Sequence, residues 1–362
     1  GALAPEESSP SEIADYSTTK LPNPLMNGVI IIDKPAGFTS HDVVNRMRRI
    51  LQQRSVGHLG TLDPLATGVL PLVTGSLTRL AQFYTTSEKT YEGIIRFGFA
   101  TNTYDADGDP IGEAQSITPR LEHLQKLSAR FLGIIEQVPP PFSAKKIHGV
   151  PAYKLARKQK EVVLKPVQVE IKEFDILAVE GDRARFRARV ASGTYMRSVA
   201  HEMGQLLGSG AHLEFLRRTA VAEFDIAQAH TLEEIEAQMK GKKEGEQERE
   251  EVREVRIKPC HSETAPELCH SETAPAAEEP AVPGHEGTAA LFVHPRQLLP
   301  QLPSVTADEP TAARIRSGRT VNLPDVSRAR QVKVFQGQSD LIAIATRIAG
   351  TLFHPKIVFS EQ

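Results

Sequence analysis

Cysteine is scarce in this chain of 362 residues, and long apolar runs are missing from it. The two cysteines, Cys260 and Cys269, lie in a polar stretch, which excludes a disulfide framework and favours a reducing cytoplasm. No run approaches the roughly 18 apolar residues that a membrane-spanning helix needs. The polar, proline-containing residues 1–27 lack the apolar core of a secretory signal. We therefore expect a cytoplasmic protein without a membrane partner.

Net charge is also small, because 43 Lys and Arg face 45 Asp and Glu, giving −2. The net charge of the whole chain argues against a nucleic-acid partner. The charge is unevenly distributed, however: residues 28–232 carry +5 and residues 281–362 carry +3. Acidic residues are in excess in 1–27, where the net charge is −3, and in 233–280, where it is −7. Local charge is what attracts phosphate, since screening acts beyond about 8–10 Å. A charge of +5 is also typical of an ordinary solvated surface, so charge alone identifies no partner.

Composition divides the chain into four segments. We expect a flexible tail over 1–27, a main domain over 28–232, an acidic low-complexity linker over 233–290 and a small β-rich domain over 291–362. The linker repeats the sequence Cys-His-Ser-Glu-Thr-Ala-Pro. Two Cys-His pairs could supply metal ligands, but their spacing matches no zinc pattern and no apolar residues surround them. We predict a disordered insertion and no metal site.

Helical and strand patterns mix along the main domain. Apolar alternation or continuous apolar runs predict strands at 28–33, 91–100, 167–180 and 183–191. Helical spacing predicts helices at 39–52, 77–84, 118–131, 151–160 and 194–207. The density of glycine and proline at 56–75 predicts a shaped loop between short strands. Because the strands and helices do not alternate regularly, we expect an α+β fold with a mixed, mostly antiparallel sheet flanked by helices.

One glycine-rich loop carries the run Asp63-Pro64-Leu65-Ala66-Thr67-Gly68. A lone Asp-Pro is typical of a turn or a helix cap. This run, however, resembles the active-site loop of the TruB family of pseudouridine synthases. Other motifs that resemble the family stand in the expected order: Asp33-Lys34-Pro35, Lys89-Thr90-Tyr91, Val138 to Lys146, Ser192 to Ser198 and Ala211 to Arg218. The resemblance covers about 28–230 and implies that this is a catalytic, pseudouridine-synthase domain.

The implied reaction isomerises uridine to pseudouridine. The bond from ribose C1′ to uracil N1 breaks, the base rotates, and a bond forms from C1′ to C5. No redox change or hydrolysis occurs, so neither a cofactor nor a metal is expected. Asp63 is the candidate catalyst, since an aspartate is already ionised at neutral pH. Attack on uracil C6, attack on ribose C1′ and abstraction of a ribose proton all stay open for it.

The resemblance also assigns roles around this carboxylate. Arg197 would hold it ionised and oriented in a closed pocket, although an isolated arginine is more often a surface or phosphate-contacting residue. Tyr91 would stack on the extracted uracil and take part in proton transfer, with Leu216 as the opposite wall; by pattern alone both are core residues. His58 would occupy the space that the base leaves, and Tyr195 would orient Arg197 or the pocket.

Basic side chains in the motif regions are expected to supply phosphate contacts. We predict Lys34 and Lys89 as substrate-binding residues. Further candidates, without individual assignment, are Lys145, Lys146, Lys154, Arg157, Arg217 and Arg218.

The leading hypothesis is a monomeric enzyme that modifies uridine 55 in the T loop of tRNA without a guide RNA. Its partner would be the T arm, and its C-terminal domain weakly resembles the PUA type of RNA-binding module, with a basic helix and turn at 313–319. One alternative is a guide-RNA-dependent enzyme of the dyskerin type, which the long segment 139–180 disfavours. The other is an RNA-binding or chaperone protein with an idle pocket, against which Asp63, Tyr91 and Arg197 together argue.

Overall fold

The computed structural model describes six stretches of the chain, which are 26–143, 146–147, 150–151, 164–241, 291–324 and 328–359. The predicted N-terminal tail lies almost wholly outside these residues, as do both cysteines and nearly all of the helix expected at 151–160.

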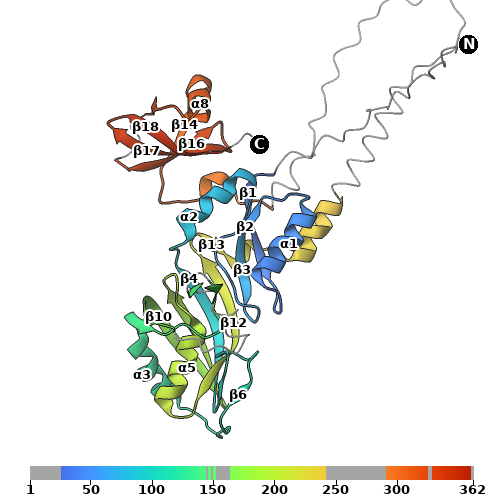
Figure 1. Cartoon of the computed structure of the whole chain (residues 1–362), viewed down its shortest axis with the longest axis vertical. Helices are drawn as coiled ribbons and strands as arrows, with labels where there is room; N and C mark the ends of the chain where they lie inside the picture. Colours follow the sequence, from blue (N-terminus) through green and yellow to red (C-terminus); the bar gives the residue numbers. More distant parts are fainter. Residues whose placement is uncertain are drawn as a thin grey trace, which may run out of the picture.

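A nine-stranded sheet forms the body of the structure (Figure 1). Its strands are β1 (Gly28–Lys34), β2 (Val56–His58), β3 (Thr67–Thr74), β4 (Lys89–Phe97), β7 (Gly133–Gln137), β10 (Val167–Glu180), β11 (Arg183–Val190), β12 (Ala211–Val221) and β13 (Phe224–Asp225). The order is β1-β3-β12-β4-β11-β10-β7, with β2 paired to β3 and β13 to β12. Only the β12–β3 pair is parallel among these described strands. The predicted mixed, mostly antiparallel sheet is confirmed.

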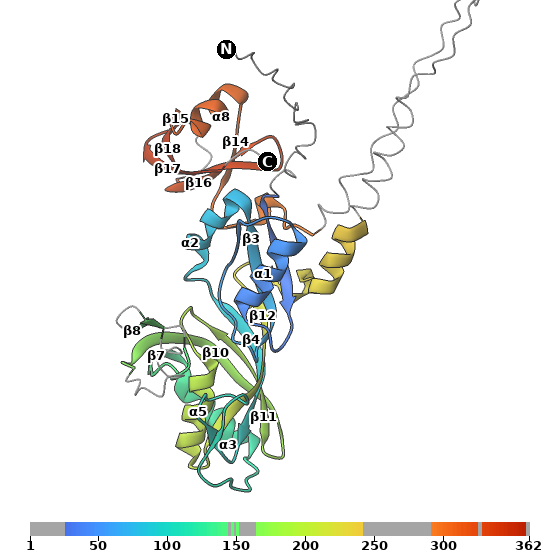
Figure 2. The same cartoon turned by 45° about the vertical axis from the view of Figure 1, so that its right-hand side comes forward.

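Helices that pack on this sheet share one hydrophobic core with it. They are α1 (Ser40–Ile50), α3 (Leu121–Ser128), α5 (Met196–Leu207) and the helical residues 232–241. Figure 2 shows α1 and the helix at 232–241 side by side. Ile235 and Met239 of that last helix are buried in the core. The packed chain therefore continues to residue 241, into the start of the predicted linker. The rest of that linker lies outside the described residues and stays a prediction.

Strand β1 is buried on both faces, which explains its continuous β-branched sequence. Ile30 and Ile32 belong to the core shared with the helices, whereas Val29 and Ile31 belong to a second hydrophobic cluster. Successive side chains of a strand point to opposite faces. The second cluster also contains residues of the C-terminal module, so this module packs against the other face of β1.

The C-terminal module is a five-stranded sheet with one helix (Figure 1). Its elements are β14 (Ser304–Ala307), α8 (Glu309–Arg316), β15 (Val321–Asn322), β16 (Gln331–Gln336), β17 (Asp340–Ala349) and β18 (Leu352–Val358). The strand order is β14-β16-β17-β18-β15. The expected small β-rich C-terminal fold is confirmed.

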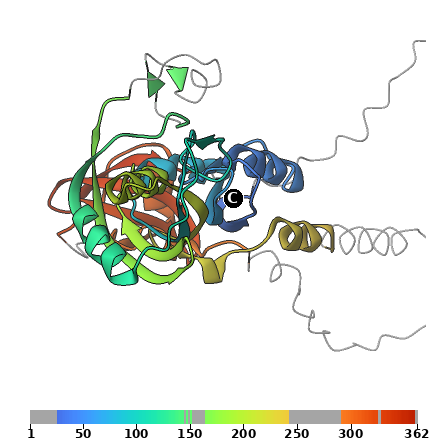
Figure 3. The same cartoon turned by 90° about the horizontal axis from the view of Figure 1, so that it is seen from below.

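Short elements complete the fold. A 3-10 helix (Gly75–Leu80) leads into α2 (Ala81–Tyr84), and β5 (Ala100–Thr101) pairs with β6 (Pro110–Ile111). Strands β8 (Lys146–Ile147) and β9 (Val150–Pro151) pair only with each other and stand away from the large sheet in Figure 3. Within the described stretches, no helix is long and apolar enough to cross a membrane.

Candidate active site

Asp63 lies in the loop between β2 and β3, residues 59–66, which we call the Asp63 loop. The loop contains no helix or strand, but buried polar side chains hold it. The hydroxyl of Ser40 accepts a hydrogen bond from the Leu62 amide at 2.8 Å and donates one to the Leu62 carbonyl at 3.1 Å. Ser40 is the first residue of α1, which begins there because Thr39 caps it. The start of a helix therefore fixes the backbone next to Asp63.

Lys34 lies beneath the same loop and is fully buried. Its Nζ donates hydrogen bonds to the carbonyls of Pro35, Phe38 and Pro64 at 2.7–3.2 Å. Burial lowers its pKa to about 8, while the nearby Asp63 carboxylate opposes this shift. An ammonium group has three N–H donors, and here all three have carbonyl partners. In this structure the Lys34 side chain therefore holds the loop, and its contact with substrate stays a prediction.

Arg218 also holds the Asp63 loop and is fully buried, although its sequence position suggested a phosphate contact. Its guanidinium donates hydrogen bonds to the carbonyls of Gly60, Thr61 and Val69 at 2.8–3.1 Å. Its neighbour Arg217 pairs with both carboxylate oxygens of Asp33, at 2.6 and 3.0 Å. Both arginines of the motif therefore serve internal contacts.

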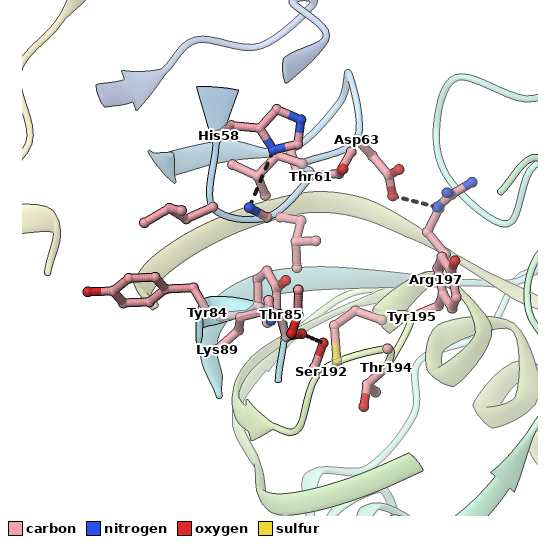
Figure 4. A pocket seen from close by; sticks show the side chains of 18 of the residues that line it. His58, Thr61, Asp63, Tyr84, Thr85, Lys89, Ser192, Thr194, Tyr195 and Arg197 are labelled. Atoms are coloured by element: carbon pink, nitrogen blue, oxygen red, sulfur yellow. Dashed lines mark hydrogen bonds and ion pairs between the residues drawn. The ribbon is translucent and has the colours of Figure 1, made fainter. Parts of the chain in front are cut away.

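Arg197, near the start of α5, lies beside Asp63 (Figure 4). Its Nε is 2.9 Å from Oδ2 of Asp63. The contact is an ion pair without an aligned hydrogen bond from Nε. The Arg197 side chain is only 5% exposed, whereas that of Asp63 is 36% exposed. The carboxylate is thus paired with a buried cation and still open to the cavity.

A second carboxylate, which sequence reasoning missed, contacts the same guanidinium. Nη1 of Arg197 lies 3.5 Å from Oδ2 of Asp105 and donates to the Thr103 carbonyl, while Nη2 donates to the Phe142 carbonyl. Burial raises the pKa of Asp105, against a hydrogen bond from Thr103 and the charge of Arg197. The only sequence signal was an acidic turn, Asp105 to Asp109, which does not reveal its distant partner.

A cavity of about 390 Å³ opens beside the Asp63–Arg197 pair, within the range of small-ligand sites. Tyr91 and Leu216, which are nearly buried, line it from neighbouring strands β4 and β12. Burial raises the pKa of the Tyr91 phenol, and contact with Arg218 opposes this shift. The structure thus brings the three predicted catalytic residues and the predicted apolar wall to one cavity.

Three further predicted site residues, His58, Tyr195 and Lys89, also line this cavity (Figure 4). His58 accepts a hydrogen bond from the Gly60 amide through Nδ1 at 3.3 Å, and burial lowers its pKa. Tyr195 precedes α5, and burial raises the pKa of its phenol. Lys89 donates to the Ser87 carbonyl at 2.7 Å, and burial lowers its pKa to about 8.

The described part of the chain contains no cluster of three or more His, Cys, Asp or Glu side chains that could hold a metal.

Comparison with known proteins agrees with this geometry. Residues 48–196 match the N-terminal domain of TruB family pseudouridylate synthases, and residues 197–262 match the tRNA pseudouridylate synthase B C-terminal domain. A tRNA pseudouridine synthase B from Solibacter usitatus is 45% identical over 336 residues, covering 92% of this chain and 100% of the relative. One from Opitutus terrae is 44% identical over 217 residues, or 60% of this chain and 90% of the relative. The chain belongs to the TruB family of pseudouridine synthases, which are isomerases.

Solved structures with the same fold are more distant in sequence. A chain from an H/ACA RNP bound to a substrate RNA containing 2′-deoxyuridine has a TM-score of 0.60 and 22% identity, covering 92% of this chain and 85% of that chain. A chain from a Cbf5-Nop10-Gar1 complex has a TM-score of 0.60 and 23% identity, with the same coverage. These structures confirm the predicted pseudouridine-synthase fold.

Proposed function

We propose that this protein converts uridine to pseudouridine at position 55 in the T loop of tRNA, without a guide RNA. The observation that carries the proposal is the 2.9 Å pair of Asp63 and Arg197 on the wall of a cavity that Tyr91 and Leu216 also line. The relative from Solibacter usitatus, all of which is covered by the match, bears the name tRNA pseudouridine synthase B. This name supports tRNA as the substrate. The distant H/ACA structures support only the fold.

In the proposed mechanism, a loop uridine leaves its stack and enters the cavity. RNA loops offer unstacked bases, and a flipped base needs new surfaces to replace its neighbours. Tyr91 and Leu216 supply those surfaces, while His58 fills the vacated space in the RNA loop. Tyr195 lies next to the catalytic pair in the same cavity and helps to shape it. Entry of the base removes water from around Asp63.

The Arg197 guanidinium stays paired with the Asp63 carboxylate and holds it in position. Asp63 then attacks uracil C6 or ribose C1′, or removes a ribose proton. Each of these paths ends with the glycosidic bond moved from N1 to C5. Tyr91 completes the proposed catalytic set as a proton-transfer group.

RNA outside the cavity would be held by basic side chains. Lys89 lines the cavity and is the proposed contact to the phosphate next to the flipped nucleotide. On the C-terminal module, α8 and its turn present Arg314 and Arg319 on the surface, whereas Arg316 pairs with Asp340 at 2.9 Å. We propose that this PUA-like module contacts the tRNA outside the T loop, and that the enzyme works as a monomer in the cytoplasm.

The test is to mix the purified chain with an unmodified tRNA transcript in the absence of guide RNA and to map pseudouridine. We expect product at position 55, and no product in a matched transcript with cytidine at that position. A wild-type transcript that stays unmodified would contradict the proposal. Light scattering of the protein–tRNA mixture checks the monomer.

A further inference from the structure

Residues 102–109, which connect β5 to β6, form a turn that we call the Asp105 turn. Two contacts of Arg197 come from this turn. Nη1 of Arg197 donates to the Thr103 carbonyl at 3.2 Å and lies 3.5 Å from Oδ2 of Asp105. The same guanidinium pairs with Asp63 through Nε. The position of the Asp105 turn therefore affects how Arg197 holds the catalytic carboxylate.

Tyr104 stands between these two contact residues and has an unusual backbone. Its φ is +67°, in the left-handed region that bulky side chains rarely adopt. The Tyr104 amide donates to the Thr101 carbonyl at 3.2 Å, and its carbonyl accepts from the Leu213 amide at 3.0 Å. Such a conformation persists only where the surroundings of the residue stabilise it. The Tyr104 side chain is therefore expected to make a stabilising contact.

His201 on α5 supplies this contact. The rings of Tyr104 and His201 are stacked, with centroids 3.7 Å apart and planes at 10°. Arg197 and His201 are four positions apart on α5, so they lie on the same face of the helix, one turn apart. The Asp105 turn is thus attached to α5 at two successive helical turns, by polar contacts at Arg197 and by ring stacking at His201.

The His201 imidazole contacts the turn through its face. Its Nε2 lies 3.0 Å from Nε2 of Gln205 on the same helix. Its Nδ1 is buried and has no hydrogen-bond partner among the residues that the structure describes. Burial lowers the pKa of His201, which favours the neutral ring. Neither His201 nor Tyr104 lines the cavity beside Asp63, so both act at a distance from the substrate.

We propose that Tyr104 and His201 are positioning residues, whose stacked rings hold the Asp105 turn against α5 and thereby keep Arg197 and Asp63 in the reactive arrangement. Both residues lie outside the sequence motifs described above. The inference rests on the proposed function, because it concerns the catalytic pair of that reaction.

Four variants separate the stacked rings from other properties of the two side chains. Tyr104→Phe and His201→Phe keep an aromatic ring. Tyr104→Asn removes the ring but tolerates the left-handed backbone, and His201→Gln removes the ring but suits a helix. In single-turnover assays on an unmodified tRNA transcript, the two ring-free variants should be about tenfold slower, with the Kd for tRNA within about twofold. The two ring-keeping variants should stay within about twofold of the wild-type rate. Equal losses in both kinds of variant would overturn the proposal.

A double variant tests whether the rings act through Asp105. In the background of Asp105→Asn, Tyr104→Asn should slow the reaction by at most about threefold, because the charged group that the turn positions is already absent. A further loss of the full tenfold would mean that Tyr104 acts by another route and would overturn the proposal.

A third experiment does not depend on activity. The protein is labelled with ¹⁵N-arginine, and the Nε resonance of Arg197 is assigned from its loss in Arg197→Lys. Tyr104→Asn and His201→Gln should each shift this resonance by more than its linewidth, and the two phenylalanine variants should leave it in place. An unshifted resonance in the ring-free variants overturns the proposal, whether or not the protein is active.

The matched control is Phe131→Leu, which breaks another aromatic pair of the same core. The rings of Phe131 and Phe174 meet edge to face with centroids 6.1 Å apart. This variant should lower thermal stability and leave both the rate and the Arg197 resonance unchanged. If the ring-free variants behave in the same way, the stack is merely structural and the proposal fails. If the wild-type protein makes no pseudouridine, the proposed function fails, and the Arg197 resonance still tests the effect of the stacked rings on Arg197.

Discussion

The Asp63 loop and the junction with the C-terminal module are held in different ways. Three buried polar residues, Lys34, Ser40 and Arg218, hold the loop through hydrogen bonds to its backbone. The junction is mainly an apolar cluster, with polar contacts from Arg79 to the Val358 carbonyl and at Glu223. There Oε1 of Glu223 accepts hydrogen bonds from the Tyr84 hydroxyl and from the Leu299 amide.

The two kinds of contact have different effects: the polar contacts orient the Asp63 loop, and the apolar contacts hold the C-terminal module on the main domain. Hydrogen bonds depend on direction, so polar contacts fix how the Asp63 loop presents its carboxylate. Apolar burial scales with area and has little directional preference, so the junction contributes stability. Changes around the loop should therefore alter catalysis more than folding, and changes at the junction should do the reverse.

The strongest test of this comparison is Asp63→Asn. We expect kcat to fall at least about 1,000-fold, because the neutral amide removes the reactive group. The Kd for tRNA, measured by filter binding, should stay within a few-fold. Asp175→Asn, at an exposed carboxylate on β10, is the control and should change neither value. A parallel loss of binding would instead make Asp63 structural.

At the junction, Leu298→Ala should act on folding. Leu298 is fully buried in the cluster that joins the two parts, so its truncation should lower the free energy of unfolding by about 2–4 kcal/mol. Denaturant unfolding measures this change, and kcat on tRNA should stay within about twofold. Leu177→Ala, at a side chain that is 51% exposed, serves as the control. A large loss of kcat without a loss of stability would break the comparison.

Asp105→Asn should have a smaller effect on the catalytic side. The buried carboxylate contacts Nη1 of Arg197, whereas Asp63 contacts Nε, so its neutral replacement should lower kcat about 10- to 100-fold with little change in Kd. Asp182→Asn removes a more exposed carboxylate from Arg96 and should cost little. Single-turnover assays compare the rates of the two variants. Equal losses of rate would contradict a specific role for Asp105.

Binding should also depend on pH through Lys89. Burial lowers its pKa to about 8, so the amine is charged below that pH and neutral above it. If Lys89 contacts phosphate, tRNA affinity should fall a few-fold as the pH rises through about 8. Lys89→Arg, which stays charged, should remove this dependence. An unchanged profile in that variant would exclude Lys89 as the titrating group.

The smallest effect is expected in the predicted linker. Replacing residues 242–288 by a Gly/Ser linker should leave kcat and the Kd for tRNA within about twofold. Extending the replacement to 233 should instead lower thermal stability, because Ile235 and Met239 leave the core. A severe loss of activity from the shorter replacement would show that the segment is functional.

Local patterns predicted the elements of the fold well. The apolar run at 28–33 and the spacing of Val43, Val44 and Met47 correspond to β1 and the buried face of α1. The helix at 232–241 was missed because dense charge surrounds its buried Ile235 and Met239. An amphipathic face of so few apolar residues gives little signal in the sequence.

Sequence motifs predicted only part of the site. They identified Asp63, Tyr91 and Arg197, which the structure brings to one cavity. They did not identify Asp105, whose partner lies 92 positions later in the sequence. Lys34 was predicted to bind substrate; its burial and its carbonyl partners arise only when the loop folds over it, and lysine is rarely buried.

The fixed backbone of the Asp63 loop determines when its conformational entropy is lost. Because its backbone is already tied to a helix start and to two buried cations, the freedom of these residues is lost when the protein folds. Little remains to be ordered when a base arrives, so binding energy from the RNA stays available for extracting the nucleotide.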